Sequence, residues 1–417
     1  MSKSAHFFKH VFGLIACLLV PTDAYSLEWS FDTTGRVSAY YSIISQGHTD
    51  LVPDPTRSGY HGYAYAADAM LQSKLAYGPV SLSTQLRFSG ANDHTNLSVD
   101  EAFVEYQVND LLYVYAGRRL RSFGQAYGLN PVDVYHDPLI ENRLYPAAQT
   151  RNDVQGQDMI GLDLLFANGG SLGFAFAPNM DPRNQGAGEN FWLLQYSGFG
   201  VGGAVDYTLS AYGGLRPGIG FSASYGIGDA NVFYVDATLR RGRQKQTLLS
   251  IAPDAALHFD GLDEKSVKPY ITVGWGHTFG NGAGLNLEYT LDTAGYSNQE
   301  WAAISQAIDM VSPVATPQMG HTLGQLNRLL NHYTLRQNYG FMRLSHDNVF
   351  GTQIKSALTV LHGFDDGSGS VGLRIEYPVT EAIEIGLYAS QKYGVHNSEF
   401  MLRPNTSSLS IYATVRF

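Results

Sequence analysis

The sequence predicts an all-β fold, a single transmembrane antiparallel β-barrel of about 18 strands, with roughly 16 to 20 as the accepted range. Three observations favour this fold. Only 15% of the 417 residues are charged, against about 25% in soluble proteins. Mean hydropathy is −0.14, which leaves no room for several helical spans of about 20 apolar residues. Apolar and polar positions alternate along most of the chain. Together these features predict a β-sheet with one face in lipid and the other face in water.

The first 26 residues are predicted to be a secretory signal peptide. They contain a basic start, an apolar run over residues 11–20, and small residues just before a cleavage position ahead of Leu27. A lipoprotein-type cleavage before Cys17 is the alternative, although the apolar run continues through that cysteine. Cleavage before Leu27 removes the one Cys of the chain, which excludes thiol catalysis and disulfides from the exported protein. The formal net charge of −10 disfavours nucleic-acid binding.

The first strand is expected to begin at Trp29, where odd positions are apolar and even positions are polar. The apolar face comprises Trp29, Phe31, Val37, Ala39, Tyr41 and Ile43. The same period of two recurs in residues 80–88 and again in residues 407–417 at the end of the chain. Each of these segments therefore predicts a strand with one dry face and one wet face.

The connections between strands are expected to alternate between short and long. Tight turns are predicted at residues 77–79, 109–110, 168–170, 198–200, 228–230, 280–284 and 380–382. Longer polar connections are predicted at residues 45–62, 89–96, 122–157, 180–189, 242–268, 294–337, 364–370 and 395–406. Short turns at one end and long loops at the other are typical of an outer-membrane barrel. Residues 246–260 could add a hairpin, and residues 301–311 and 322–335 could form short helices.

Alternating strands in a membrane are expected to form a closed barrel, because an open sheet edge is not tolerated there. In hydrocarbon every backbone N–H and C=O requires a partner, so a sheet is tolerated only when it closes on itself. Apolar faces would then meet lipid and polar faces would meet water, and the 27 Tyr fit aromatic girdles at the two interfaces. A soluble β-sandwich or propeller would alternate as well, but it would not explain the leader, the loop asymmetry or the low charge.

The chain resembles the porin-like outer-membrane β-barrels of Gram-negative bacteria over residues 27–417. It ends on Phe417 at the close of an alternating strand, similar to the terminal aromatic of such barrels. The hairpin from Glu101–Tyr106 to Gly117-Arg118-Arg119, followed by Ser122-Phe123-Gly124, resembles one found in several of these families, including alginate-export-type channels. The resemblance implies a cell outer membrane location reached through the periplasm, with lipid and lipopolysaccharide as surroundings. It also implies insertion by the outer-membrane assembly machinery through the strand that ends in Phe417.

The functional chemistry of a barrel this wide is expected in its lumen, which side chains alone do not fill. The third long connection, residues 122–157, is a candidate for a loop that folds into the lumen, and residues 294–337 are expected to form a large extracellular loop. The candidate pore-lining or constriction residues are Arg87, Glu101, Glu105, Arg119, Arg121, Asp133, Asp137, Glu141, Arg143 and Arg151. Loop acids facing wall bases would set a transverse field, which is how pores choose between ions. The alternatives are charged side chains paired along the wall, and an exposed loop that binds lipopolysaccharide.

The function expected from these features is passive diffusion of small hydrophilic or charged solutes. Export of a polymer, or a receptor or adhesion role for the loop 294–337, is left open, as is a homotrimer. An outer-membrane hydrolase is less favoured, because the nearest Ser and His, in His396-Asn397-Ser398, lie in a loop and in the wrong order for a nucleophile–base pair. No catalytic residue, metal or cofactor is expected, since the 13 His are scattered without ligand spacing.

Overall fold

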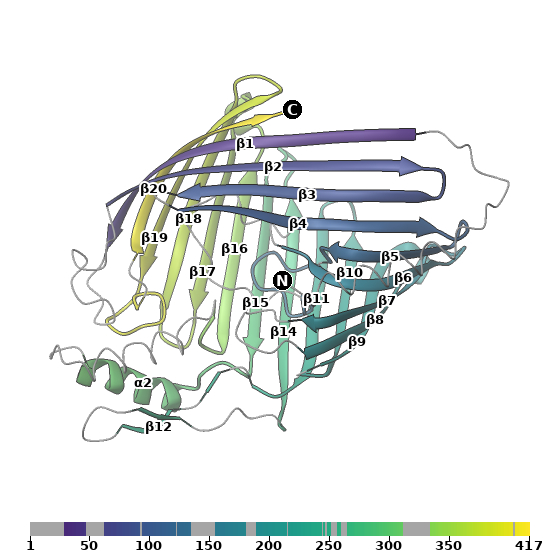
Figure 1. Cartoon of the computed structure of the whole chain (residues 1–417). Coiled ribbons are helices and arrows are strands. Elements are labelled where there is room, and N and C mark those ends of the chain that lie inside the picture. The colour runs from purple at the N-terminus through teal and green to yellow at the C-terminus, as the bar shows by residue number, and fades with distance from the viewer. Residues whose placement is uncertain are drawn as a thin grey trace.

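The computed structural model of the protein is dominated by β-strands that close into a barrel (Figure 1). It describes residues 29–46, 62–91, 94–121, 123–134, 155–180, 189–214, 216–243, 245–246, 248–251, 257–259, 265–311, 334–402 and 405–417. The proposed signal peptide, including Cys17, lies outside the described residues.

Twenty strands and one α-helix make up the described structure. The strands of the first half are β1 (Trp29–Gln46), β2 (Tyr63–Tyr77), β3 (Val80–Ala91), β4 (His94–Gln107), β5 (Leu112–Arg119), β6 (Gln157–Leu165), β7 (Ser171–Met180), β8 (Glu189–Gly200), β9 (Val205–Gly213) and β10 (Gly218–Ile227). Those of the second half are β11 (Asn231–Arg241), β12 (Leu248–Ile251), β13 (Leu257–Phe259), β14 (Val267–Thr278), β15 (Gly284–Asp292), β16 (Asn338–His346), β17 (Lys355–Gly363), β18 (Ser368–Pro378), β19 (Ile383–Tyr393) and β20 (Asn405–Arg416). The helix is α2 (Asn298–Val311), and single 3-10 turns occur at η2 (Val201–Gly203) and η3 (Val349–Gly351). In the part of the chain that is described, no helix is long and apolar enough to cross a membrane.

Eighteen of the strands form one closed antiparallel sheet, which confirms the predicted fold and strand number. Each strand pairs with the barrel strands that precede and follow it, with β11 next to β14, and β1 pairs with both β2 and β20. Hydroxyl pairs close this seam on the inner face, between Ser38 and Thr414 at 2.8 Å and between Ser42 and Ser410 at 2.7 Å. The terminal Phe417 exchanges two backbone hydrogen bonds with Gly35 of β1. Because β1 and β20 are joined, the barrel has no open edge.

The two strands outside the barrel form the hairpin that the sequence placed in residues 246–260. β12 pairs with β13, and this hairpin and α2 lie beyond one end of the barrel, opposite the end where the chain terminates (Figure 1). α2 includes the predicted helix 301–311, whereas most of the second predicted helix, residues 322–335, lies outside the described residues. One predicted loop is wrong: β3 continues to Ala91 and β4 begins at His94, so residues 89–91 and 94–96 of the predicted long connection belong to strands.

The alternation of the sequence sorts side chains between the two faces of the barrel as predicted. On β1, Trp29, Phe31, Val37 and Ile43 are exposed on the outer face, while Ser38 and Ser42 are buried on the inner face. β20 continues the pattern, with exposed Leu409 and Ile411 alternating with buried Ser410 and Tyr412. The outer wall is thus apolar and the inner wall is mainly polar.

The tyrosines do not all lie in outer girdles, which corrects part of the sequence interpretation. Tyr115, Tyr212, Tyr234 and Tyr412 are buried on the inner wall, and each lies directly opposite a glycine of the neighbouring strand. At Gly274 an added Cβ would meet the Tyr234 ring at 2.2 Å, and at Gly386 it would meet the Tyr412 ring at 2.2 Å. The missing side chain lets each ring lie against the wall, as aromatic residues do over glycines in other sheets.

Candidate functional site

The chain that follows β5 crosses the interior of the barrel. The backbone N–H groups of Gln125 and Ala126 donate hydrogen bonds of 2.7 and 2.8 Å to Oδ2 of Asp236, on the inner face of β11. Those of Tyr127 and Gly128 donate to the two carboxylate oxygens of Glu288 on β15, at 2.5 and 2.9 Å. Going round the sheet, β15 is nearly opposite β5. We call residues 123–134 the crossing segment.

Further polar contacts hold the two carboxylates and the crossing segment in register. Ser222 donates a 2.6 Å hydrogen bond to Oδ1 of Asp236, and the Tyr234 hydroxyl donates one of 2.7 Å to Glu288. Thr272 of β14 donates a 2.8 Å hydrogen bond to the Leu129 carbonyl. Asp236 is fully buried and Glu288 is nearly so. Such charge-assisted bonds to backbone N–H groups are stronger than neutral ones, so four consecutive amides are fixed to the wall.

Glycines allow the crossing segment to approach the wall this closely. Gly124 has a φ of +93°, and a Cβ there would lie 2.6 Å from the Asp236 carboxylate. A Cβ at Gly128 would lie 2.5 Å from the ring of Phe341 on β16. A larger residue at either position would displace the segment, at Gly124 because of the positive φ and the close approach, and at Gly128 because of the close approach alone.

Apolar contacts fasten the segment at both sides of the lumen. Phe123 and Val134 pack against a buried inner-wall cluster on β5 to β9. The members of that cluster are Tyr115, Met159, Ala175, Ala177, Leu193 and Tyr212. Leu129 packs on the other side with Tyr339, Leu361 and Phe400. The segment is therefore anchored at both walls rather than hanging from one strand.

The three predicted wall arginines each have a carboxylate partner on the wall itself. Arg87 pairs with Asp100 at 2.6 Å, and Arg121 pairs with Asp163 at 2.7 Å. Arg119 lies between Glu105 at 3.5 Å and Asp163 at 3.4 Å. Its guanidinium also lies 4.2 Å from the centre of the Tyr115 ring, a cation–π arrangement. The positive charge of this wall is thus balanced locally.

The other predicted site residues fall into three groups: acids near the wall arginines, an acid on the crossing segment, and residues outside the described part of the chain. Glu105 belongs to the wall network, and Glu101 accepts a 2.7 Å hydrogen bond from the backbone N–H of Leu120, where the chain leaves β5. Asp133 lies half-buried on the crossing segment. Asp137, Glu141, Arg143 and Arg151 lie outside the described residues, so the facing of loop acids and wall bases stays a prediction.

Four carboxylates that bind the wall arginines or the crossing segment were not among the predicted constriction residues: Asp100, Asp163, Asp236 and Glu288. Asp163 and Asp236 each stand between apolar neighbours in a strand, a signal that strict alternation already contained. Asp100 could not be found in this way. The register between β3 and β4 shifts at Gln85 and Leu86, so that Glu101 faces Gln85 and Val99 faces Leu86. This β-bulge turns both Asp100 and Glu101 toward the lumen, which an unbroken period of two forbids.

Several segments pack against one another at the end of the barrel that carries α2. Trp301 of α2 donates a 3.2 Å hydrogen bond to the Asn397 carbonyl, and Arg243 pairs with Glu300. Buried Glu399 accepts a 3.0 Å hydrogen bond from the Leu335 backbone and a 2.6 Å bond from the Tyr339 hydroxyl. These contacts tie residues 294–311, 334–337 and 394–402 together, and Phe400 and Tyr339 also pack against Leu129 of the crossing segment.

Comparisons with known proteins agree with the architecture and go no further than it. Neither a protein-family model nor a curated protein matches the sequence.

Among the residues described, no group of three His, Cys, Asp or Glu is placed to hold a metal ion.

Several solved structures have the same fold. Pseudomonas aeruginosa OccK2 (OpdF) superposes with a TM-score of 0.56 at 10% identity, over 93% of this chain and 97% of that one. OccD3 (OpdP) of the same organism gives 0.54 at 11% identity, covering 93% and 91%. The Pseudomonas aeruginosa outer membrane protein opdK gives 0.54 at 9% identity, covering 93% and 99%. The chain therefore has the fold of porin-like outer-membrane barrels.

Proposed function

We propose that this protein is a porin-like channel in the outer membrane of a Gram-negative bacterium, through which small hydrophilic solutes diffuse down their gradients. The closed barrel, its apolar outer wall and its polar inner wall support this function. So does the likeness in fold to an outer membrane protein of Pseudomonas aeruginosa. A barrel of this strand number leaves an aqueous interior unless something narrows it.

The observation that carries the proposal is the crossing segment. Its four backbone hydrogen bonds to Asp236 and Glu288 hold it inside the lumen, where it reduces the free cross-section. We propose that it forms the constriction with the adjoining wall, and that Arg87, Glu101, Glu105, Arg119, Arg121 and Asp133 line the path of the solute. Because Arg87, Arg119 and Arg121 are paired with acids, the selectivity of this part of the pore would come from the orientation of the pairs rather than from a net wall charge.

Planar-bilayer recording of the purified barrel tests the proposal. Stable stepwise conductance is expected, and swelling of proteoliposomes in small sugars or amino acids should show that uncharged and charged solutes enter. A folded barrel that gives no conductance steps and no swelling would exclude the channel function. Hydrolysis of lipid or peptide by the same preparation would favour an enzyme instead.

A further inference from the structure

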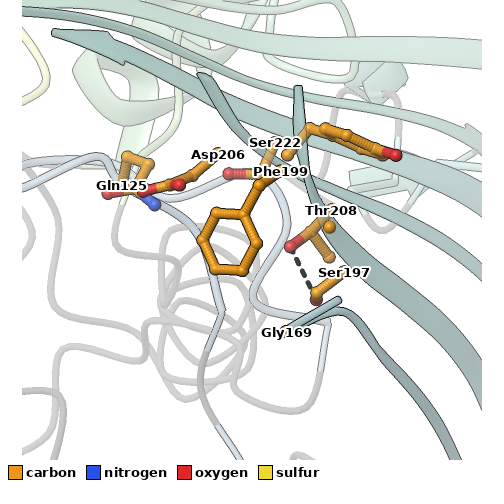
Figure 2. Close-up of a pocket in the computed structure, with 9 residues that line it drawn as sticks. Gln125, Gly169, Ser197, Phe199, Asp206, Thr208 and Ser222 are labelled. Carbon is orange, nitrogen blue, oxygen red and sulfur yellow. Dashed lines mark hydrogen bonds between the residues drawn. The ribbon is translucent and has the colours of Figure 1, made fainter. Parts of the chain in front are cut away.

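A small cavity of about 160 Å³ opens in the inner wall beside the crossing segment. It is bounded by Gln125 of that segment, by residues of β8, β9 and β10, and by Gly169 of the turn between β6 and β7, near the short turn that joins β8 to β9 (Figure 2). A water molecule takes up about 30 Å³ of liquid, so the cavity holds roughly five waters or one small head group. It is therefore a subsite for part of a solute and not a chamber for a large one.

The lining of this cavity combines a carboxylate, an aromatic ring and hydroxyl groups. Asp206 and Phe199 lie opposite each other in the register of β8 and β9, and both side chains are exposed to the lumen. In Figure 2 the ring of Phe199 lies between Ser197 and Thr208 on one side and Gln125 and Asp206 on the other. Ser197 and Thr208 share a 2.9 Å hydrogen bond at the edge of the cavity.

The electrostatic environment of the cavity is negative. No Lys, Arg or His is among its lining residues, and Asp206 has no ion-pair partner within the described part of the chain. Ser222, also in the lining, donates a hydrogen bond to Asp236, so that a second carboxylate lies on the inner wall next to the cavity. Asp236 accepts hydrogen bonds from a hydroxyl and from backbone amides, none of which carries a compensating positive charge.

We infer that this cavity binds the head group of a small organic cation, such as a substituted ammonium, as the solute passes the constriction. Asp206 supplies the opposite charge, Phe199 supplies a ring face for a cation–π contact, and the side-chain amide of Gln125 has an oxygen that can accept a hydrogen bond. The inference rests on the proposed channel function, because it names a class of solute for that path.

Other solute classes fit the lining less well. An anion would be repelled by Asp206 and by Asp236 behind Ser222, with no basic side chain in the cavity to compensate. A neutral polyol could use the hydroxyls, but it would gain nothing from the charge of Asp206. Charge and shape can therefore be separated by experiment, with two probes of the same size.

Choline and its uncharged carbon analogue 3,3-dimethyl-1-butanol are the two probes. Titration calorimetry of the purified full-length barrel in detergent, at low salt, should show binding of choline and weaker binding of the alcohol. Asp206→Asn keeps the side-chain shape and should weaken choline binding by about fivefold, as expected for an accessible ion pair. Phe199→Leu should weaken it by about threefold through loss of the cation–π contact. Asp229→Asn, in the exposed turn between β10 and β11, is the matched control and should bind choline like the unaltered protein.

Two results would overturn the inference. One is equal binding of choline and the alcohol. The other is an Asp206→Asn barrel that binds choline as tightly as the Asp229→Asn control. If Asp206→Asn fails to fold, the binding of choline and of the alcohol to the unaltered barrel and to Phe199→Leu still tests the inference. Equal binding of the two probes would overturn it. Conductance steps without choline binding would remove the cation subsite and leave the channel, whereas choline binding without conductance would remove the channel and leave the site.

Discussion

Replacing Glu288 by Gln is expected to loosen the crossing segment from the barrel wall. Glu288 accepts three hydrogen bonds, from the backbone N–H groups of Tyr127 and Gly128 and from the Tyr234 hydroxyl. A glutamine side chain has one acceptor oxygen, and its amide nitrogen would face a backbone N–H, so at least one bond is lost. Asp236 and the apolar contacts of the segment stay in place.

The size of the effect follows from the charge on the acceptor. A hydrogen bond to a charged group contributes about 1.5–3 kcal/mol. Since each 1.4 kcal/mol is a factor of ten, the released state of the segment should become about ten- to a hundredfold more populated. Fluctuations between conductance levels in bilayers should become more frequent as a result.

Hydrogen–deuterium exchange of the amides in residues 123–134 measures this release without relying on transport. Glu376→Gln is the matched control, because Glu376 also accepts a 2.7 Å hydrogen bond from a wall tyrosine, Tyr412, and no described contact links it to the crossing segment. We expect faster exchange at residues 125–128 in Glu288→Gln only. Equal exchange in the two variants would show that the carboxylate does not hold the segment.

Three further changes have defined outcomes. Gly274→Ala should lower the free energy of unfolding of the barrel by about 1–3 kcal/mol, because its Cβ would meet the opposite tyrosine ring at 2.2 Å. Gly226→Ala has open space around it and should leave the free energy of unfolding unchanged, which thermal unfolding of the two variants measures. Arg119→Ala frees acidic partners on the wall and should shift the reversal potential in a salt gradient toward cations, by up to about fivefold in permeability ratio; an unchanged potential would exclude this wall from selectivity. Burial raises the pKa of Glu300 at the start of α2, but hydrogen bonds from Arg243 and the Ser297 backbone outweigh it and hold the pKa at about 2, below its usual 4.5. The attachment of α2 should therefore weaken as the pH falls from about 4.5 toward 2, and tryptophan fluorescence of Glu300→Gln should lack that transition.

Alternation in the sequence was sufficient for the barrel, for its strand number and for the sorting of side chains between the two faces. The strand starting at Trp29 and the one ending at Phe417 show why. Period two is a local property of the chain, and hydrocarbon permits only a closed sheet, so local pattern and solvent together determine the fold. The position of a long connection after β5 also followed from local signals, since turn residues and polar runs mark strand ends.

The site depended on contacts between residues far apart in the chain. Asp236 and Glu288 meet amides more than a hundred residues away, and no periodicity of β11 or β15 indicates what lies across the lumen. Asp100 faces inward because of a bulge, which depends on the pairing of β3 with β4 and not on either strand alone. The sequence by itself determined a wall with a dry side and a wet side. The tertiary structure decided which charges neutralise one another and where the chain crosses the interior, because both depend on which strands face each other once the sheet has closed.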